Sequence, residues 1–430
     1  MLSSKYLIFS SCLLTGVSTL AMAQSDSKTK NHPKPSLRQC AKDDDHCYNT
    51  SRFQIGPYLN KDRLFDGSEL LVNVSTNRED DRLLLQQYQL AQDCEKLGIP
   101  FPGYPRLVIS GKLEAMYNFA QNYSGPNTNK LWFDAAELDL NLQATSWVNV
   151  YASIDYDPSR TSHQVFMNRA FMTIGNLEKS PVYLTVGRMY VPFGRYASNM
   201  VTEPYTQDIG RTRADAVEIG YQQKGKNALH AEVYTYEGHT RFQPFGGKYS
   251  TQYGADAGYQ YNLGDVSGEF GASYISNLAD SNGIQGTIFN NAATFQSQNI
   301  PAVDVYGSIA YKQFNLLGEY ITALKRFDPK AFAYESQGAK PSGFNTELSY
   351  NFKSFNHPSS IAVGYSRTNQ AVAMGLPKNS YRVVYNINIW KNTNLALEFR
   401  HDVNYSVQEG SPYGAHQSSN AITAQFDFFF

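Results

Sequence analysis

The sequence predicts an all-β protein: a transmembrane antiparallel β-barrel of about 16 strands with a short N-terminal periplasmic helical region. Charged residues make up only 17% of the chain, whereas aromatic residues make up 14%, supplied mainly by 31 Tyr and 25 Phe. From residue 106 onward, apolar and polar residues alternate. Beyond the N-terminus no run of ~18 apolar residues exists, which excludes a membrane protein built from helices. A barrel fits because its strands alternate and need no continuous apolar run.

Residues 1–23 have the pattern of a secretory signal peptide. A lysine near the start precedes a mostly apolar stretch, and Ala21-Met22-Ala23 matches a small-x-small cleavage site. We therefore expect export and a mature chain that begins at Gln24.

Residues 24–105 are expected to form an N-terminal periplasmic region. Its first part, 24–56, is polar and rich in Lys, Asp, Ser and Pro, so we expect a flexible tail. The exported chain meets an oxidising compartment, where Cys40 and Cys47 are candidates for a disulfide. Pairings that involve Cys94 stay open. No metal site is expected here, because a fourth ligand with normal spacing is lacking.

A helix is expected at about 78–97. Asn77 can cap it, three acidic residues follow at 79–81 near the positive end, and Gly98 can end it. Such a short helix needs a partner surface to be stable. It can dock on the periplasmic mouth of the barrel, enter the lumen, or pack with copies of itself.

Residues 106–430 are expected to form the barrel. About sixteen alternating runs, each roughly 20 residues long with its connection, match membrane strands of ~9–11 residues. One run shows the pattern: Leu138, Leu140 and Leu142 alternate with Glu137, Asp139 and Asn141. A soluble β-sandwich can also alternate. Here, however, short connections such as 263–264 and 312–313 alternate with long ones, as periplasmic turns alternate with extracellular loops.

The two ends of the barrel are expected in the periplasm, because an even number of strands returns the chain to its starting side. The last run alternates and ends at Phe430. This ending resembles the signal that bacterial barrel assembly machinery selects, so that machinery and outer-membrane lipid are expected partners. The chain is too short for a 22-stranded transporter with a plug domain, whereas sixteen strands leave a lumen wide enough for water.

The inward face of the predicted barrel carries many charged residues. The lumen charges that we single out are Lys112, Glu114, Glu137, Asp139, Arg169, Arg382 and Arg400. The same face also carries Asp155, Glu232, Asp256, Glu269, Asp304, Lys312, Glu319, Glu347 and Glu398. This excess of acidic residues would favour cations. The alternative is a set of solvated charge networks without selectivity.

The long connection 190–211 is the candidate substrate-binding element, because the third long loop of porins often folds inward. The candidate binding residues are Tyr190, Arg195, Tyr196, Tyr205 and Arg211, with Arg213 just beyond. Arginine binds carboxylates through two hydrogen bonds, and tyrosine adds flat contact area and a hydroxyl. This set could bind an anionic, oxygen-rich solute. The competing interpretation is an interfacial girdle of aromatic residues with surface arginines.

Several classes of function are not supported by the sequence. The formal net charge of −1 lacks the basic footprint of a nucleic-acid binder, so no nucleic acid is expected as a partner. Signature motifs of hydrolases, zinc proteases and P-loop enzymes are absent from the sequence. We therefore expect no enzyme, no cofactor and no catalytic residues.

Several segments, in order along the chain, resemble the LbtU-type siderophore porins, a family of outer-membrane iron-acquisition barrels. They are Phe65–Asn73, Glu79–Leu85, Leu107–Glu114, Asn122–Pro126, Asn168–Gly175 and Tyr190–Gly194. The resemblance covers roughly residues 56–430 and implies a barrel that takes up ferric siderophore without an energised plug. It supplies no motif of binding residues.

The resulting prediction is a channel or receptor of the Gram-negative outer membrane that mediates uptake of a ferric siderophore. One alternative is a general or nutrient-selective diffusion porin for another small solute, and another is a surface adhesin that uses the long loops. The sequence allows an oligomer but does not specify one.

Overall fold

The computed structural model describes residues 51–56, 77–158, 163–240, 250–290, 298–411 and 417–430. The predicted signal peptide, Cys40 and Cys47 lie outside these ranges. In the part of the chain that the structure describes, no helix is long and apolar enough to cross a membrane.

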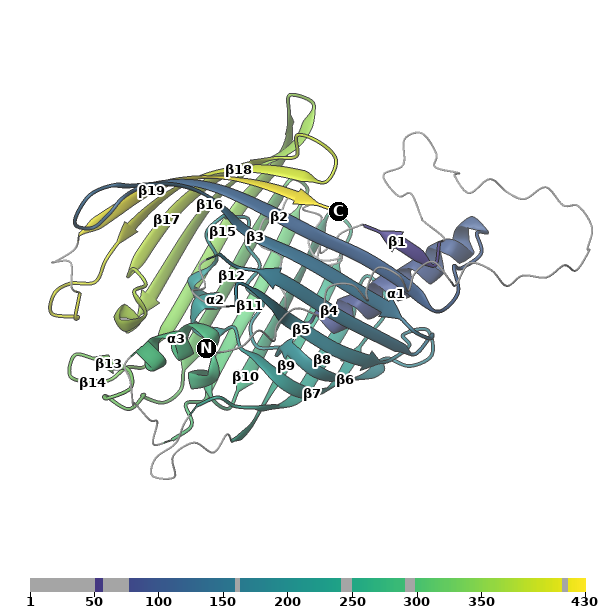
Figure 1. Ribbon diagram of the computed structural model, residues 1–430, viewed down its shortest axis with the longest axis horizontal. Coiled ribbons are helices and arrows are strands. Elements are labelled where there is room, and N and C mark those ends of the chain that lie inside the picture. Colours follow the sequence, from purple (N-terminus) through teal and green to yellow (C-terminus); the bar gives the residue numbers. More distant parts are fainter. Residues whose placement is uncertain (1–50, 57–76, 159–162, 241–249, 291–297, 412–416) are drawn as a thin grey trace, which may run out of the picture. The chain divides into compact units, whose positions relative to one another are not determined.

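Sixteen antiparallel strands form a closed barrel, which confirms the predicted fold class (Figure 1). The strands are β2 (Arg106–Gln121), β3 (Thr128–Gln143), β4 (Val148–Tyr156), β5 (Val165–Ile174), β6 (Val182–Tyr190), β7 (Arg213–Gln222), β8 (Ala228–Glu237), β9 (Thr251–Asn262), β10 (Val266–Ile275), β11 (Ala302–Tyr311), β12 (Phe314–Ala323), β15 (Ser342–Ser354), β16 (His357–Asn369), β17 (Asn379–Ile387), β18 (Thr393–Val403) and β19 (Ser418–Phe429). Strand β19 pairs with β2 and closes the sheet, with Phe429 opposite Lys112 and Asn420 opposite Gln121. Closure pairs the first and last strands of the barrel along Lys112–Gln121 of β2, so that the backbone groups there are satisfied, as a membrane requires.

The start of β2 extends past the end of β19, and a short strand covers it. Strand β1 (Phe53–Ile55) pairs in parallel with Leu107–Ile109. Directly beyond it, the backbone of Phe430 exchanges hydrogen bonds of 3.0 Å with Gly111. The expectation of a flexible tail as far as residue 56 is therefore wrong at its end, because β1 satisfies an edge that β19 leaves open.

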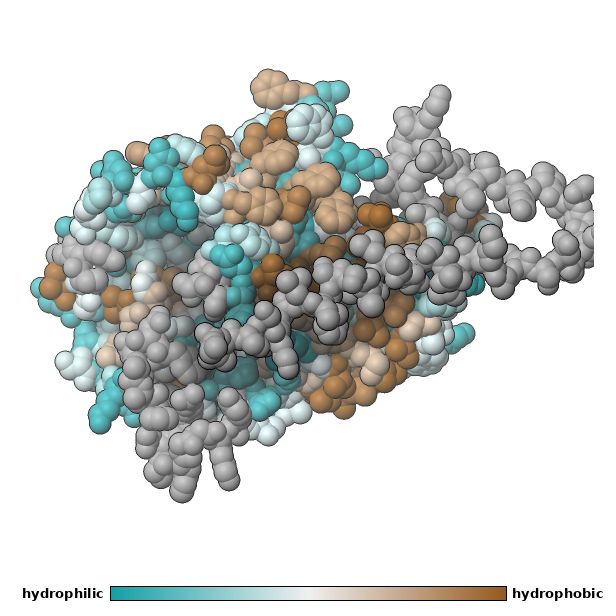
Figure 2. All heavy atoms as spheres, viewed as in Figure 1, coloured by the Kyte–Doolittle hydropathy of each residue, from teal (hydrophilic) through white to brown (hydrophobic). Residues whose placement is uncertain are grey.

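The strands place apolar side chains outside and polar side chains inside. In β3, Leu138 and Leu142 are 37% and 38% exposed, whereas Glu137 and Asp139 between them are 7% and 0% exposed. Hydrophobic side chains gather over the strands in Figure 2. Because inward charges avoid lipid and outward apolar groups meet it, the surface defines a membrane-spanning barrel.

The connections differ at the two ends of the barrel. At the short-turn end they are 144–147, 175–181, 223–227, 263–265, 312–313, 355–356 and 388–392. At the long-loop end they are 122–127, 157–164, 191–212, 238–250, 276–301, 324–341, 370–378 and 404–417. The connection 191–212 is thus the third at its end, as predicted.

Short elements lie within the long loops. They are α2 (Tyr205–Gly210), η1 (Leu278–Asp280), α3 (Asn282–Asn290), the paired strands β13 (Ala333–Tyr334) and β14 (Gln337–Gly338), and η2 (Val372–Met374). Helix α2 packs against β12, β15 and α3. The third long loop therefore lies against the inner wall and does not project away from the barrel.

Helix α1 (Glu79–Leu97) precedes the barrel in sequence and lies partly within it (Figure 1). Its first residues are buried, whereas Leu97 at its end is 59% exposed. Gly98 ends the helix in the left-handed conformation, with a φ of 65° that glycine adopts without strain. Cys94 is the free cysteine among the described residues and is buried.

Candidate functional site in the barrel lumen

The first turn of α1 is bound by charged and polar groups of the barrel wall. Asp80 accepts a hydrogen bond of 2.5 Å from the Thr185 hydroxyl on β6. Asn77 does not cap the helix: its side-chain nitrogen donates to the carbonyls of Phe193 and Gly194 at 2.8 and 3.0 Å. The residue expected to be the helix cap therefore joins α1 to the third long loop.

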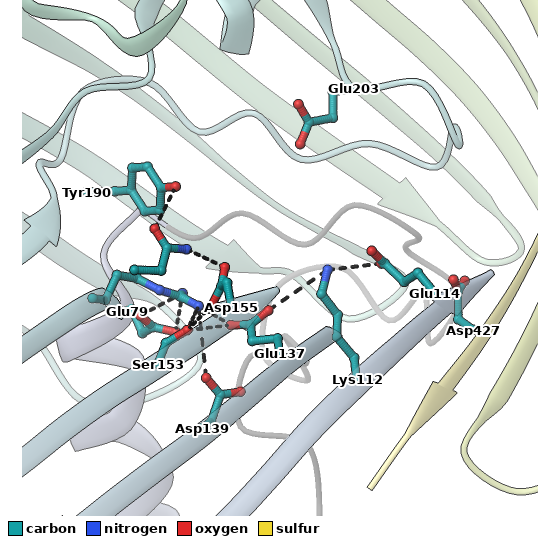
Figure 3. Close-up of polar contacts among 12 residues, drawn as sticks. Glu79, Lys112, Glu114, Glu137, Asp139, Ser153, Asp155, Tyr190, Glu203 and Asp427 are labelled. Carbon is teal, nitrogen blue, oxygen red and sulfur yellow. Dashed lines mark hydrogen bonds and ion pairs between the residues drawn. The ribbon is translucent and has the colours of Figure 1, made fainter. Parts of the chain in front are cut away.

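Arg169 on β5 is the cation that holds Glu79. Its Nη1 lies 2.8 Å from both carboxylate oxygens of Glu79, and its Nη2 contacts Glu137 and Ser153. Glu79, Glu137, Asp139 and Ser153 converge in Figure 3. The Arg169 side chain is 1% exposed, so these contacts form away from bulk water.

Arg78 forms a second buried cluster at the start of α1. Its guanidinium lies 2.6 Å from Asp81, 2.9 Å from Glu269 on β10 and 3.4 Å from Glu232 on β8. Sequence reasoning missed Arg78 as an anchor. The sequence signal was the unbroken polar stretch 77–82, in which Arg78 stands between the expected cap Asn77 and three acidic residues.

The third long loop, residues 191–212, crosses the lumen and is held by three carboxylates of the wall. Glu319 on β12 accepts from the backbone N–H groups of Arg195 and Tyr196 at 2.5 and 3.0 Å. Glu347 on β15 accepts from the N–H of Asn199 at 2.7 Å, and Glu398 on β18 from that of Val201, also at 2.7 Å. Hydrogen bonds to a charged acceptor are about twice as strong as neutral ones. The loop is therefore fixed through its backbone.

Three of the six predicted binding residues are buried in this loop contact. Arg195 lies 3.5 Å from Glu269, and Tyr196 is 1% exposed. The Tyr205 hydroxyl donates to Asp402 at 3.3 Å, and Cζ of Arg382 lies over the Tyr205 ring, 4.6 Å from the ring centroid. These three side chains contact other groups of the protein, and their part in binding a solute stays a prediction.

The other three predicted residues come together near Asn168 on β5. Arg213 Nη1 donates to the Asn168 side-chain oxygen at 2.5 Å, and the Tyr190 hydroxyl donates to it at 3.2 Å. The Arg211 guanidinium stacks on the Tyr190 ring at 5.0 Å and lies 3.5 Å from Glu203. Figure 3 shows Tyr190 and Glu203. This basic and aromatic group stays a candidate for binding an anionic solute.

The seven singled-out lumen charges face the interior. Lys112 lies 2.9 Å from Glu114 and 3.9 Å from Glu137 (Figure 3). Asp139 accepts a hydrogen bond of 2.5 Å from the Tyr151 hydroxyl. Arg382 and Arg400 both contact Thr202 of the third loop, the first at its carbonyl and the second at its hydroxyl. Three of these charges therefore hold α1 or the third loop directly: Arg169 contacts Glu79 of α1, and Arg382 and Arg400 contact Thr202 of the loop.

The second half of α1 is packed less completely than the first. A cavity of about 400 Å³ separates it from the turns 144–147 and 175–181, and its lining includes Leu84, Tyr88 and Leu177. Leu84 itself is buried against Leu177 and Tyr183. The helix is therefore held mainly by its charged N-terminal turns.

Asp208 is a titratable group of α2 in the third loop. Burial raises the pKa of its carboxyl from 3.8 to about 7; Glu203 adds to the shift, whereas Arg211 and Arg382 oppose it. The loop therefore contains a carboxyl that changes charge near neutral pH.

Together, the closed barrel, its apolar outer surface and its loop-filled lumen define a porin-type membrane barrel. The chain belongs to the UPF0422 family. It is 48% identical over 418 residues to a UPF0422 protein of Coxiella burnetii, covering 94% of this chain and 89% of that protein. It is 35% identical over 406 residues to a UPF0422 protein of Legionella pneumophila, covering 87% of this chain and 76% of that protein. No family model matches the chain.

Solved structures share the fold at low sequence identity. The outer membrane channel DcaP of Acinetobacter baumannii aligns with a TM-score of 0.50 and 14% identity, covering 76% of this chain and 97% of that one. Pseudomonas putida OprB aligns with a TM-score of 0.50 and 10% identity, covering 80% and 97%. These similarities show the fold, and none of the names refers to siderophores.

Proposed function

We propose that this chain is a small-solute channel of the Gram-negative outer membrane in which α1 acts as a removable lumenal plug. One observation carries the proposal: the N-terminal turns of α1 are anchored to the inner wall by Arg169, Thr185 and Glu269, inside a sixteen-stranded barrel. A barrel of this size encloses a water-filled lumen unless something occupies it. The exposed end of α1 and its bordering cavity leave the helix room to move.

The proposed orientation places both chain ends in the periplasm. The short turns lie at the same end of the barrel as β1 and Phe430. Outer-membrane barrels have short periplasmic turns and longer extracellular loops. Helix α1 would then enter the lumen from the periplasmic mouth, and carboxylates of the inner wall would favour cations in the lumen.

A reversible disulfide tests the plug. Asp80 and Thr185 are hydrogen-bonded across the α1–β6 contact, so cysteines at both positions would lock α1 when oxidised. We expect low conductance in planar bilayers under oxidising conditions and higher conductance after reduction, with the Thr185→Cys single variant as the control. Equal conductance in both states would refute the plug. A barrel that conducts no ions in either state would refute the channel.

A ferric siderophore is the more specific candidate solute. The sequence resemblance to siderophore porins supports it, as does the basic and aromatic group of Tyr190, Arg211 and Arg213. The test is uptake of radiolabelled iron with the organism's own siderophore, in a deletion strain and its complemented partner. Equal uptake would reject the siderophore while leaving the channel proposal intact.

A further inference from the structure

Four neighbouring strands bring ionisable and polar side chains into one row on the lumen wall. The strand register places Glu232 of β8 opposite Asp256 of β9. Asp256 lies opposite Ser273 of β10, and Ser273 lies opposite Asp304 of β11. Three carboxylates are thus held at fixed positions on a rigid sheet, and each of them is 3% exposed or less.

A second row, directly beside the first, contains two glycines. His230 lies opposite Gly258, Gly258 opposite Gly271, and Gly271 opposite Tyr306. A Cβ atom on Gly258 would overlap the His230 imidazole, and one on Gly271 would overlap the Tyr306 hydroxyl. Because the two glycines have no side chains, the side chains of His230 and Tyr306 can lie across the sheet and point toward each other.

The two rows converge on a small group of donor atoms. His230 Nε2 lies 3.1 Å from the Tyr306 hydroxyl and 3.2 Å from Asp256 Oδ2. The Tyr306 hydroxyl lies 3.0 Å from the same Asp256 oxygen. One nitrogen of His230 and one oxygen each of Glu232 and Asp256 all lie within 4.8 Å of one another.

Three buried carboxylate oxygens on these strands lack hydrogen-bond partners in the described part of the chain, although Glu232 contacts Arg78 and the Tyr183 hydroxyl through its other oxygen. Glu232 Oε2 and both oxygens of Asp304 have no hydrogen-bond partner among the described residues. Glu232 is 1% exposed and Asp304 is 0% exposed. The negative charges of Asp256 and Glu319 repel that of Asp304. Burying charge without a partner is costly, and a bound cation would offset that cost.

We propose that His230, Glu232 and Asp256 bind a first-row divalent metal cation, with the Tyr306 hydroxyl beside them as a further oxygen donor. One imidazole with carboxylate oxygens suits Mn²⁺, Fe²⁺ or Zn²⁺, whereas Ca²⁺ and Mg²⁺ prefer oxygen ligands alone. A cavity of about 30 Å³ borders His230 and Glu269, but Glu232 and Asp256 do not line it, and three guanidinium groups (Arg78, Arg82 and Arg195) do. This site is independent of the proposed conduction, because binding can be measured on protein that conducts nothing.

The site shares a carboxylate with the anchor of α1. The Arg78 guanidinium lies 3.4 Å from Glu232 and 2.9 Å from Glu269. A divalent cation on Glu232 would repel this guanidinium. Docked Arg78 therefore lowers the affinity of the site for the cation. Because coupling between two sites is reciprocal, a bound cation weakens the docking of α1 by the same factor.

The test is Mn²⁺ binding to the full mature chain, refolded in detergent without lipopolysaccharide. Mn²⁺ is the probe because it has low affinity for the thiolates that the cysteines could supply. Electron paramagnetic resonance counts bound Mn²⁺, and its pulsed form detects an imidazole nitrogen in the coordination shell. We expect one bound ion with a nitrogen signal. We also expect loss of that signal in His230→Gln and at least tenfold weaker binding in Glu232→Gln.

Matched variants separate the site from general effects on the barrel. His401→Gln removes another partly buried imidazole of the barrel and should leave binding unchanged. Gly258→Ala should weaken binding by displacing His230, whereas Gly318→Ala, where a Cβ meets nothing within 4 Å, should not. Arg78→Gln should tighten binding about fivefold, because it removes a nearby positive charge. The proposal is overturned by absent Mn²⁺ binding, or by a nitrogen signal that persists in His230→Gln.

Discussion

Replacing Arg169 by methionine tests whether the buried ion pair holds α1 in the lumen. Arg169 is 1% exposed and contacts Glu79 of the helix, Glu137 of β3 and Ser153 of β4. Its guanidinium also lies over the Tyr151 ring at 5.5 Å. Methionine keeps much of the side-chain volume but leaves three nearby carboxylates (Glu79, Glu137 and Asp139) without this cation.

The expected magnitude follows from the burial of these groups. Removing one partner of a buried ion pair costs about 3–5 kcal/mol, because the remaining charge is uncompensated. The barrel is held by sixteen paired strands, so the cost falls on the docking of α1, which can leave the lumen and hydrate Glu79. At 1.36 kcal/mol per tenfold change, the ratio of undocked to docked helix should rise about 150- to 5,000-fold.

Cys94 provides the assay, because it lies on α1 and is buried in the docked state. With Cys40→Ser and Cys47→Ser as the background, the rate of maleimide labelling at Cys94 reports the undocked population. We expect much faster labelling in Arg169→Met, and partial return toward the original rate when Glu79→Gln is added. Arg188→Met is the control, because its pair with Asp215 at 2.9 Å is exposed and contributes at most about 1 kcal/mol. Labelling of Arg169→Met at the parental rate would refute the role of the ion pair.

Two further predictions concern the third long loop. Glu398→Gln should loosen residues 191–212, because it weakens charge-assisted hydrogen bonds to Val201 and Thr202, each of which contributes about 1.5–3 kcal/mol. Faster proteolytic cleavage in this loop would support it, with the exposed Glu237→Gln as control, and an unchanged rate would reject it. For Asp208, the folded pKa of about 7 exceeds the ordinary 3.8, so the folded loop binds more protons and loses stability as pH rises through this range. The rate of proteolytic cleavage in the loop, normalised to an unfolded substrate at each pH, should therefore increase from pH 5 to 8. Asp208→Asn should flatten this pH dependence. An equally steep profile in Asp208→Asn would contradict the role of the Asp208 carboxyl.

The sequence predicted the wall of the barrel better than the contacts of the segments that lie inside the lumen. Alternation along β3 predicted that Glu137 and Asp139 point into the barrel, because successive side chains on a strand point to opposite faces of the sheet. The same reasoning could not show that Arg195 pairs with Glu269, or that the backbone N–H groups of Arg195 and Tyr196 donate to Glu319. These partners are separated by more than seventy residues in sequence, and no local pattern connects them.

The sequence by itself determined the barrel, its even number of strands, the position of its third long loop and the acidic character of its inner face. These properties follow from period-two alternation and connection length, which are local and repeat along the chain. Only the tertiary structure decided that α1 enters the lumen, that Arg78 and Arg169 anchor it, and that His230, Glu232 and Asp256 meet. Those outcomes depend on closure of the sheet, because closure brings distant strands to face a common interior where each buried charge must find a partner.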